Sequence, residues 1–244
     1  MRRIWKIILI LSLAGNVSIV YVGYKALKYR SYINYWLEKY TQVVSEFSAR
    51  NKYGEENRRL KSVVQVGNRV VFFGSQITEN WNLPDLFPQF ETVNRGVTGQ
   101  RVGGFLLRFV PDVLELYPKA VVIEISSYNF RAECPIKEIM DYTVSLADLA
   151  RSRNVEPIIG TVIPPRKDAA KIDSYALRDS LEVFNRWLIE NALNHRWRYV
   201  NFSAVLSDES GYLREDLSVG AIDPDAEGYR LMASEVSRVL NALD

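Results

Sequence analysis

The sequence predicts an α/β domain with a parallel sheet of about five strands, preceded by one transmembrane helix and a juxtamembrane helix. An uncharged run stands near the N-terminus, an aromatic-rich helical stripe follows it, and short apolar runs then alternate with amphipathic segments. Near-continuous apolar strands separated by helices are typical of a parallel sheet covered on both faces. We therefore expect an anchor at 1–30, a Tyr-rich juxtamembrane helix or stalk at 31–67 and the α/β domain at 68–244.

The uncharged run covers residues 7–24. As a helix it would be roughly 27 Å long, close to the thickness of about 30 Å of a bilayer core. The alternative is a cleaved signal peptide with a small-residue site at Ser12-Leu13-Ala14, but cleavage there would leave an apolar run of only residues 7–11. We favour an uncleaved signal anchor in the membrane bilayer, which makes this a single-pass protein. In the usual outcome for such an anchor, the soluble domain is periplasmic or otherwise extracytoplasmic.

The charge balance separates the anchor from the body of the protein. The formal net charge is +2, but residues 1–30 hold six basic residues and no acidic one. The other 214 residues hold 25 basic and 29 acidic residues, a net charge of −4. This argues against nucleic-acid binding, which needs a basic face on the folded domain. One Cys and one His, His195, exclude an intrachain disulfide and a multi-His metal site. We expect no metal and no other cofactor.

The juxtamembrane segment carries apolar residues at helical spacing. The stripe consists of Ile33, Trp36, Leu37, Tyr40, Val43, Val44 and Phe47. One interpretation is an interfacial aromatic belt followed by a stalk helix that packs on its own domain; the other is a docking surface for neighbouring integral membrane proteins. The residues expected to contact the membrane or a partner are Trp5, Tyr21, Tyr24, Tyr29, Tyr32, Tyr35, Trp36 and Tyr40. The polar segment 51–59 contains Gly54 and predicts a break before the globular domain.

The elements of the domain follow from the alternation of apolar runs and helical stripes. Strands are expected at 69–74, 90–94, 120–125, 157–162 and 198–202. Helices are expected at 77–81, 102–117, 136–153, 174–195 and 225–243. In open parallel sheets, ligands bind beyond the carboxyl ends of the strands. This places a candidate site around residues 74–76, 94–96 and 126–129, together with 164–165 and the loop 220–224 before the last helix.

These segments, in this order, resemble the SGNH (GDSL-like) hydrolase family from about residue 69 to residue 243. The sequence VVFFGSQIT stands where members of the family have a strand followed by Gly-Asp-Ser-Ile-Thr. Residues 94–99 match the second block, Asn-Arg-Gly-x-x-Gly, and Ser126-Ser127-Tyr128-Asn129 stands at the third, Gly-x-Asn-Asp. Residues 220–224 stand where the family has Asp-Gly-x-His-Pro. The resemblance implies a three-layer, flavodoxin-like fold.

The catalytic triad of that family is absent at the matching positions. In the family, the Ser attacks an acyl carbonyl, the His takes its proton and the Asp orients the His. Here these positions hold Gln76, Asp223 and Gly220, respectively. Of the positions that stabilise the oxyanion, Gly99 is retained, while the Asn position holds Tyr128, or Asn129 after a shift of one residue. We therefore interpret the chain as a pseudoenzyme without catalytic residues.

Other readings of the same site stay open. The residues expected to line the relic cleft are Ser75, Gln76, Gly99, Ser126, Ser127, Tyr128 and Asn129. Ser75 is a possible alternative nucleophile, but it needs a base, and His195 is expected at the opposite end of the sheet. Gln76 and Asp223 could bind a polar ligand such as a sugar, although an empty relic cleft is favoured. Acidic residues at 223, 225 and 227 are more typical of helix capping than of a cation site.

The preferred functional hypothesis is a structural or accessory subunit. In it, the inactive domain packs against or caps partners within a larger membrane protein assembly. The alternatives are a cell-envelope module that binds a glycan without turning it over, and an active esterase or deacetylase with a rearranged site.

Overall fold

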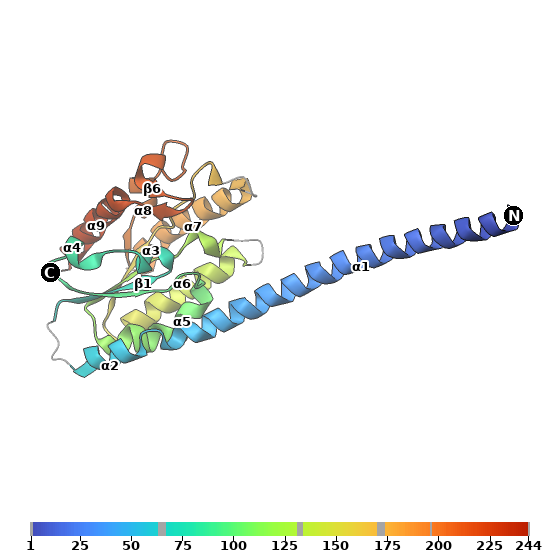
Figure 1. Ribbon diagram of the computed structural model, residues 1–244. Helices are drawn as coiled ribbons and strands as arrows, with labels where there is room; N and C mark the ends of the chain where they lie inside the picture. The colour runs from blue at the N-terminus through green and yellow to red at the C-terminus, as the bar shows by residue number, and fades with distance from the viewer. Residues whose placement is uncertain (1, 63–66, 131–133, 170–173, 196, 244) are drawn as a thin grey trace. The chain divides into compact units, whose positions relative to one another are not determined.

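The computed structural model describes residues 2–62, 67–130, 134–169, 174–195 and 197–243, and for residues 45–48, 174–177 and 193 it describes the backbone alone. The chain divides into two compact units, Met1–Ser45 and Glu46–Asp244. Figure 1 labels many of the elements of the two units.

The first unit is one helix. It forms most of α1 (Arg2–Ser48), and an 18-residue window within it has a mean hydropathy of 2.0 with none of its residues buried. By length and composition α1 is able to cross a membrane, a test that a signal sequence near the N-terminus also passes. Its large apolar side chains are exposed, including Trp5 at 67% and Trp36 at 54%. The predicted membrane-spanning and juxtamembrane helices are thus continuous.

The second unit is built on a parallel sheet of five strands. The strands are β1 (Arg69–Gly74), β2 (Glu91–Gly96), β3 (Ala120–Ile123), β4 (Glu156–Gly160) and β5 (Arg198–Val200). They lie in the order β2-β1-β3-β4-β5, and every neighbouring pair is parallel. The sequence therefore predicts the sheet correctly, while several strands end earlier than expected; β3, for example, stops at Ile123 instead of residue 125.

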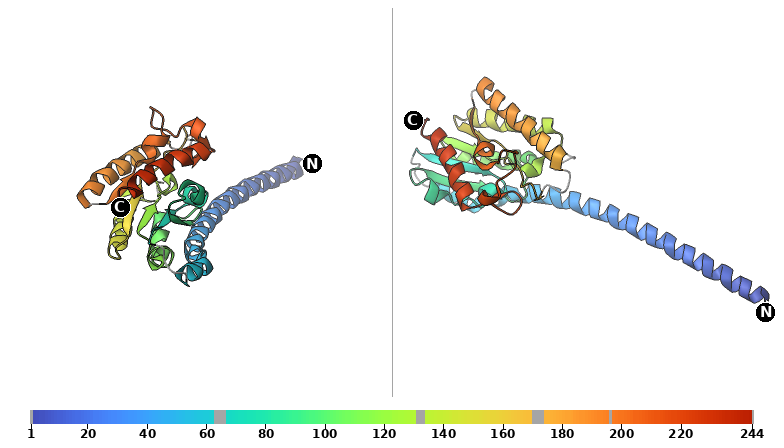
Figure 2. Two further views of the ribbon diagram at one scale, coloured as in Figure 1. Left: turned by 90° about the vertical axis from the view of Figure 1, so that its left-hand side faces the viewer. Right: turned by 90° about the horizontal axis from the view of Figure 1, so that it is seen from above.

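Helices cover both faces of the sheet, as Figures 1 and 2 show. Alternate residues of a strand point to opposite faces, so each strand supplies both layers of the core. In β1, Val71 and Phe73 pack with α5 (Val102–Asp112), α6 (Ile136–Arg151) and α7 (Ser174–His195). Val70 and Phe72 pack on the other face with α3 (Gln76–Glu79), α4 (Leu83–Leu86), α8 (Phe202–Leu206) and α9 (Ala226–Leu240). The result is the three-layer arrangement that the sequence predicts.

Four of the five expected helices end earlier than predicted. The helix expected at 102–117 ends at Asp112, is followed by a 3₁₀ turn at Leu114–Leu116, and reaches Tyr117 in a left-handed backbone conformation. Pro111 in the last turn lacks an amide hydrogen, and its ring crowds the preceding turn, which favours this early end. The helix α9 ends at Leu240 rather than residue 243. A short antiparallel pair, β6 (Ser218–Val219) and β7 (Asp223–Pro224), precedes α9 and was not expected.

The polar segment 51–59 is mostly helical, and the break predicted there is a turn at residues 52 and 53. A 3₁₀ turn at Ala49–Asn51 follows α1, and a second helix, α2 (Gly54–Ser62), begins at the glycine that suggested the break. Although α2 is polar, Asn57 in it is 4% exposed. Its side chain reaches into the domain, so a composition typical of a linker here belongs to a helix packed on the fold.

Candidate functional site

The candidate site lies where β1, β2 and β3 end and the loop 220–224 returns. The backbone at the end of β1 turns directly into α3, with Ser75 as the residue that precedes the helix. This sharp strand-to-helix turn brings Gln76 to the carboxyl end of the sheet, as the sequence predicts. The side chain of Asp223 reaches Gln76 from a segment 147 residues further along the chain.

Gln76 and Asp223 form a direct pair. The Gln76 Nε2 atom donates a hydrogen bond of 2.6 Å to Asp223 Oδ1, and both side chains are half-buried. Gly220, at the third triad position, has a φ of +79°, a conformation that glycine adopts without strain. The two positions that would hold a nucleophile and a general base therefore hold an amide donor and a carboxylate acceptor that satisfy each other.

Ser75 is held by a buried carboxyl group. Its backbone N–H donates to Glu124 Oε2 at 2.8 Å and its Oγ donates to the same atom at 3.0 Å, while Thr78 Oγ1 donates to it at 3.1 Å. Ser75 and Glu124 are 3% and 4% exposed. Burial raises the pKa of Glu124, although the hydrogen bonds from Ser75 and Thr78 act in the opposite direction. A Cβ atom at Gly74 would collide with Thr78 and Glu124, so the glycine leaves room for this cluster.

The second block acts as a brace for the site. Asn94 donates from Nδ2 to the Thr78 carbonyl at 2.6 Å, and its Oδ1 accepts from the Gly96 amide at 2.9 Å. A Cβ atom on Gly96 would collide with the backbone of Glu79 and lie 2.7 Å from the Thr78 carbonyl carbon. Gly99 has a φ of +76°, which only glycine adopts readily. The end of β2 and α3 are thus packed backbone against backbone.

The third block points mostly into the protein. Asn129 is 1% exposed, accepts a hydrogen bond from the Val102 amide at 2.8 Å and donates to the Ser126 carbonyl at 2.9 Å. Ser126 and Ser127 are each 4% exposed, and Ser126 Oγ accepts from the Tyr128 amide. Tyr128 is more open, at 37% exposed. The side-chain amide of Asn129 therefore links the start of α5 to the loop after β3, which is a structural role.

Two buried arginines join the strand ends to the elements behind them. Arg108, fully buried on α5, donates to the carbonyls of Gly74 at 3.1 Å and Arg95 at 2.8 Å, and pairs with Asp112 at 3.1 Å. The guanidinium of Arg108 also lies 4.1 Å from the ring centroid of Phe73. Burial lowers the pKa of both Arg95 and Arg108, while nearby acidic side chains oppose that shift. Arg108 therefore fixes the ends of β1 and β2 relative to each other.

Asn57 of α2 completes this network. Its Oδ1 accepts from Arg95 Nε at 3.1 Å and Nη2 at 2.8 Å, and its Nδ2 donates to Asp112 Oδ1 at 2.6 Å. Tyr53 donates from its hydroxyl to the Gly96 carbonyl at 2.5 Å, and burial raises the pKa of Tyr53 to about 12, with the charge of Glu79 adding to the shift. The segment after α1 is thus bonded directly to the second block.

Lys52 adds an ion pair beside Tyr53. It lies 2.5 Å from Glu79 Oε1, and Glu79 Oε2 accepts from the backbone and hydroxyl of Thr98 at 2.6 and 2.8 Å. Burial tends to raise the pKa of Glu79, but the hydrogen bonds from Lys52 and Thr98 outweigh it and lower that pKa. Within this brace, the family motif marks Asn94, Arg95, Gly96 and Gly99. The sequence does not predict the contributions of Asn57, Arg108 and Glu124. For Glu124 alone there is a visible signal, because this charged residue stands inside the apolar run VVIEI.

Residues outside the site fall where the sequence places them. His195 is exposed at the end of α7, just before β5 begins, and its ring stacks on Trp197 with centroids 4.9 Å apart. Asp225 caps α9 by accepting from the Gly228 amide at 2.8 Å, which confirms the capping prediction. Within the described ranges, no three His, Cys, Asp or Glu side chains gather so that they could hold a metal ion.

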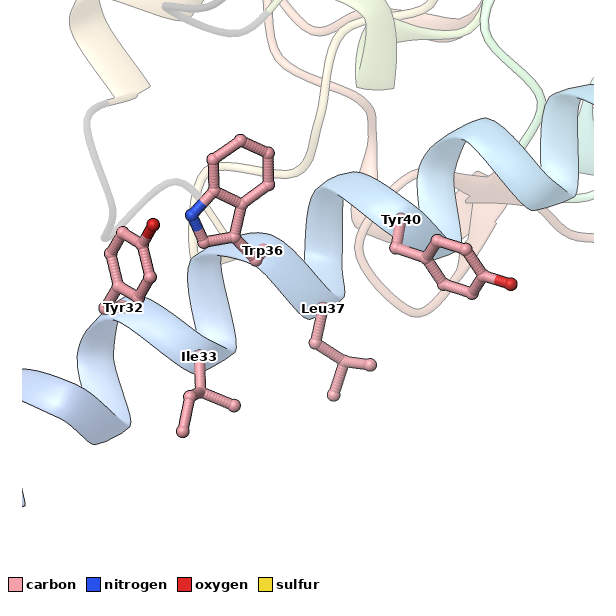
Figure 3. A pocket seen from close by; sticks show the side chains of 5 residues that line it. All are labelled: Tyr32, Ile33, Trp36, Leu37 and Tyr40. Atoms are coloured by element: carbon pink, nitrogen blue, oxygen red, sulfur yellow. The ribbon is translucent and has the colours of Figure 1, made fainter.

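The aromatic residues of α1 up to Ser45 belong to the first unit. Five of the apolar side chains of α1 line a shallow hollow along one stretch of the helix: Tyr32, Ile33, Trp36, Leu37 and Tyr40 (Figure 3). The Trp36 ring packs edge-on against Tyr32 and Tyr35, with centroids 6.1 and 5.7 Å apart. Phe47, the last member of the predicted stripe, lies outside the side chains that the structure describes.

Comparison with known proteins agrees with the fold. The sequence pattern of the GDSL-like Lipase/Acylhydrolase family matches residues 67–231. A search of proteins with curated functions finds no match.

Solved structures show the same architecture. A putative acylhydrolase from Bacteroides fragilis superposes with a TM-score of 0.70 at 26% identity, covering 79% of this chain and 96% of that one. A GDSL-like lipase from Bacteroides thetaiotaomicron also gives 0.70 at 26% identity, covering 80% and 98%. A catalytic mutant of an acetylxylan esterase from Geobacillus stearothermophilus gives 0.59 at 16% identity, covering 72% and 95%, and shows likeness of fold alone.

Proposed function

The chain belongs to the GDSL-like lipase/acylhydrolase family, and we propose that this member is a non-catalytic, membrane-anchored protein that serves as an accessory subunit of a larger membrane assembly. The observation that carries the first half of this proposal is the 2.6 Å hydrogen bond from the Gln76 amide to the Asp223 carboxylate. These residues occupy the positions at which the family resemblance expects the nucleophile and its base.

The chemistry of this pair supports the loss of hydrolysis. A carboxamide is not a nucleophile at neutral pH, and a carboxylate is a far weaker base than imidazole. Because the Gln76 N–H already donates to Asp223, the pair stabilises itself and leaves no proton relay to a substrate. The one His of the sequence is His195, which lies before the start of β5, whereas Gln76 lies after the end of β1.

The burial of Ser75 argues against a rearranged esterase site. A nucleophile must approach an acyl carbon, but Ser75 is 3% exposed and its hydroxyl donates to Glu124. The backbone N–H and the hydroxyl of Ser75 both donate hydrogen bonds to the Glu124 carboxyl group. This arrangement is typical of a buried structural cluster.

Hydrolysis of short acyl esters by the purified full chain tests the proposed loss of catalysis. We expect no turnover above a buffer blank for the natural sequence. Turnover that disappears in Ser75→Ala but persists in Ser126→Ala would refute the proposal and identify Ser75 as a nucleophile.

The assembly role is supported by α1. This helix is able to cross a membrane, and beyond the uncharged run it presents exposed aromatic side chains such as Tyr32 and Trp36. A periplasmic domain on a single-pass anchor, with other integral membrane proteins as neighbours, fits these features. Extraction of native membranes in mild detergent should co-purify the chain with stoichiometric membrane partners, whereas a chain that always elutes alone would contradict the assembly role.

A glycan-binding module is the second candidate. Its support is that Gln76 and Asp223 are half-buried at the strand ends, since amide and carboxylate groups are suited to hydrogen-bonding sugar hydroxyls. Binding of envelope glycans that is lost in Gln76→Ala and Asp223→Ala, but kept in a variant of the exposed residue Asn82, would favour this candidate over the empty relic.

A further inference from the structure

The part of α1 beyond the uncharged run has one apolar and one polar face. Apolar side chains recur at alternating spacings of four and three residues: Tyr29, Ile33, Trp36, Tyr40 and Val43, here called the seam. Their exposures run from 50% to 68%. The opposite side of the same turns carries Ser31, Asn34, Glu38, Thr41 and Gln42, together with Tyr35. A helix divided in this way normally covers its apolar face with another element.

Lipid does not reach most of the seam. If residues 7–24 fill the bilayer core, Ile33 stands about 13 Å and Val43 about 28 Å beyond its edge along the helix axis, at about 1.5 Å per residue. The headgroup layer is about 5–8 Å thick on each side, because the whole bilayer is about 40–45 Å and its core about 30 Å. The charged residues Lys25, Lys28 and Arg30 also oppose sliding this part of the helix into the core. The cover for Ile33 to Val43 must therefore be protein.

The spacing of the seam favours a parallel helix as that protein. Apolar residues at alternating intervals of three and four repeat every seven residues, which is the pattern of helices that wind around each other. Copies of one chain anchored in the same bilayer run parallel and at the same height. The same seam residues of the two copies therefore lie at the same height, so the two helices can pair without shifting along their axes.

Charge and side-chain size along the seam are compatible with a second copy. Between Ser31 and Val44 the only charges are Glu38 and Lys39, so identical copies carry no net charge in this stretch. Continued toward the N-terminus by the same spacing, the seam meets Ala26 and then, within the uncharged run, Val22, Ile19, Gly15 and Ser12. Three of these five residues, Ala26, Gly15 and Ser12, are small. Small residues let two helices approach closely in lipid, where association depends on packing rather than on the exclusion of water.

From these features we propose that the chain associates with a second copy of itself, in parallel, through the seam on α1. The proposal goes beyond the accessory function, because such a dimer forms whether or not the domain joins a larger assembly. The aromatic side chains of Tyr29, Trp36 and Tyr40 are larger than the usual aliphatic residues, so the two helices should lie toward the wide end of the range of about 8–10 Å between packed helices.

Cysteine crosslinking of the full chain in membranes tests the proposal. The native Cys134 is first replaced by Ser, and single cysteines are then placed at Val43 in the seam or at Thr41 on the polar face. A disulfide forms readily only where Cα atoms come within about 7 Å. Oxidation should yield several-fold more of a species of twice the 28.1 kDa chain mass for Val43→Cys than for Thr41→Cys. Equal yields at both positions, or no dimer at either, would overturn the proposal.

A second measurement guards against a variant that disturbs the helix. Two differently tagged copies of the natural chain should co-purify from mild detergent, and Ile33→Glu should reduce this several-fold while Asn34→Glu should not. Failure of the natural copies to co-purify overturns self-association alone. It leaves the accessory role to be judged by the separate search for other membrane partners.

Discussion

Replacement of Asn57 by Ala probes the attachment of α2 to the domain. The substitution removes three hydrogen bonds, two from Arg95 and one to Asp112, at a site where Asn57 is 4% exposed. Hydrogen bonds to charged groups are worth about 1.5–3 kcal/mol. Two charged groups each lose their Asn57 partner, so we expect destabilisation of about 3 kcal/mol at the low end of that range.

Thermal unfolding of the full chain in detergent measures this loss. For a domain of this size, 1 kcal/mol corresponds to about 2–4 °C, so the midpoint should fall by about 6–12 °C. Asn82→Ala is a matched control, because Asn82 is exposed and its amide contacts the exposed Asp85. That change should stay within about 0.5 kcal/mol. If Asn57→Ala lowers the midpoint no more than Asn82→Ala does, the buried network does not hold α2.

Three further predictions concern the strand ends. Gln76→Ser, alone or with Asp223→Ala, should give no ester hydrolysis, because no His completes the relay; turnover of a short acyl ester by either variant would contradict this. The folded-state pKa of Glu124 is raised, so its contribution is present below the unfolded pKa of about 4.3 and is lost as pH rises through the folded pKa. The unfolding midpoint of the natural chain relative to Glu124→Gln should therefore fall as pH rises from 4 to 8, and a constant difference would be inconsistent with a raised pKa. Gly96→Ala places a Cβ atom against the backbone of Glu79 and should cost about 1–3 kcal/mol in a denaturant titration; an unchanged midpoint would show that this contact yields freely.

The sequence predicts the sheet well because the strands carry a strong local signal. The runs 70–73 and 120–123 are apolar throughout and buried, as parallel strands covered on both faces require. The ends of elements are less visible because they depend on tertiary contacts. The backbone turn at Val113 to Tyr117, for example, follows from Pro111 and from packing. The apolar spacing of the sequence continues through this turn and therefore predicts a longer helix.

The substituted triad positions could also be read from the sequence, since the family blocks stand in the expected order. What Gln76 and Asp223 do for each other could not, because the contact joins residues that are 147 positions apart. The same holds for α2, where a polar composition resembles a linker. Its decisive residue, Asn57, has partners on β2 and α5, and no local pattern marks a residue whose stabilising contacts are all distant.

The contacts of α2 and of the residues just before it also determine where this domain can be separated from α1. A protease cut or a gene truncation just before Arg69, where the sheet starts, would strip Tyr53 from the Gly96 carbonyl and Asn57 from Arg95 and Asp112. A fragment that begins at Ala49 keeps these groups together. It also retains Lys52, which pairs with Glu79 of α3. A fragment with the native strand-end geometry therefore begins at Ala49, well before the first strand starts at Arg69.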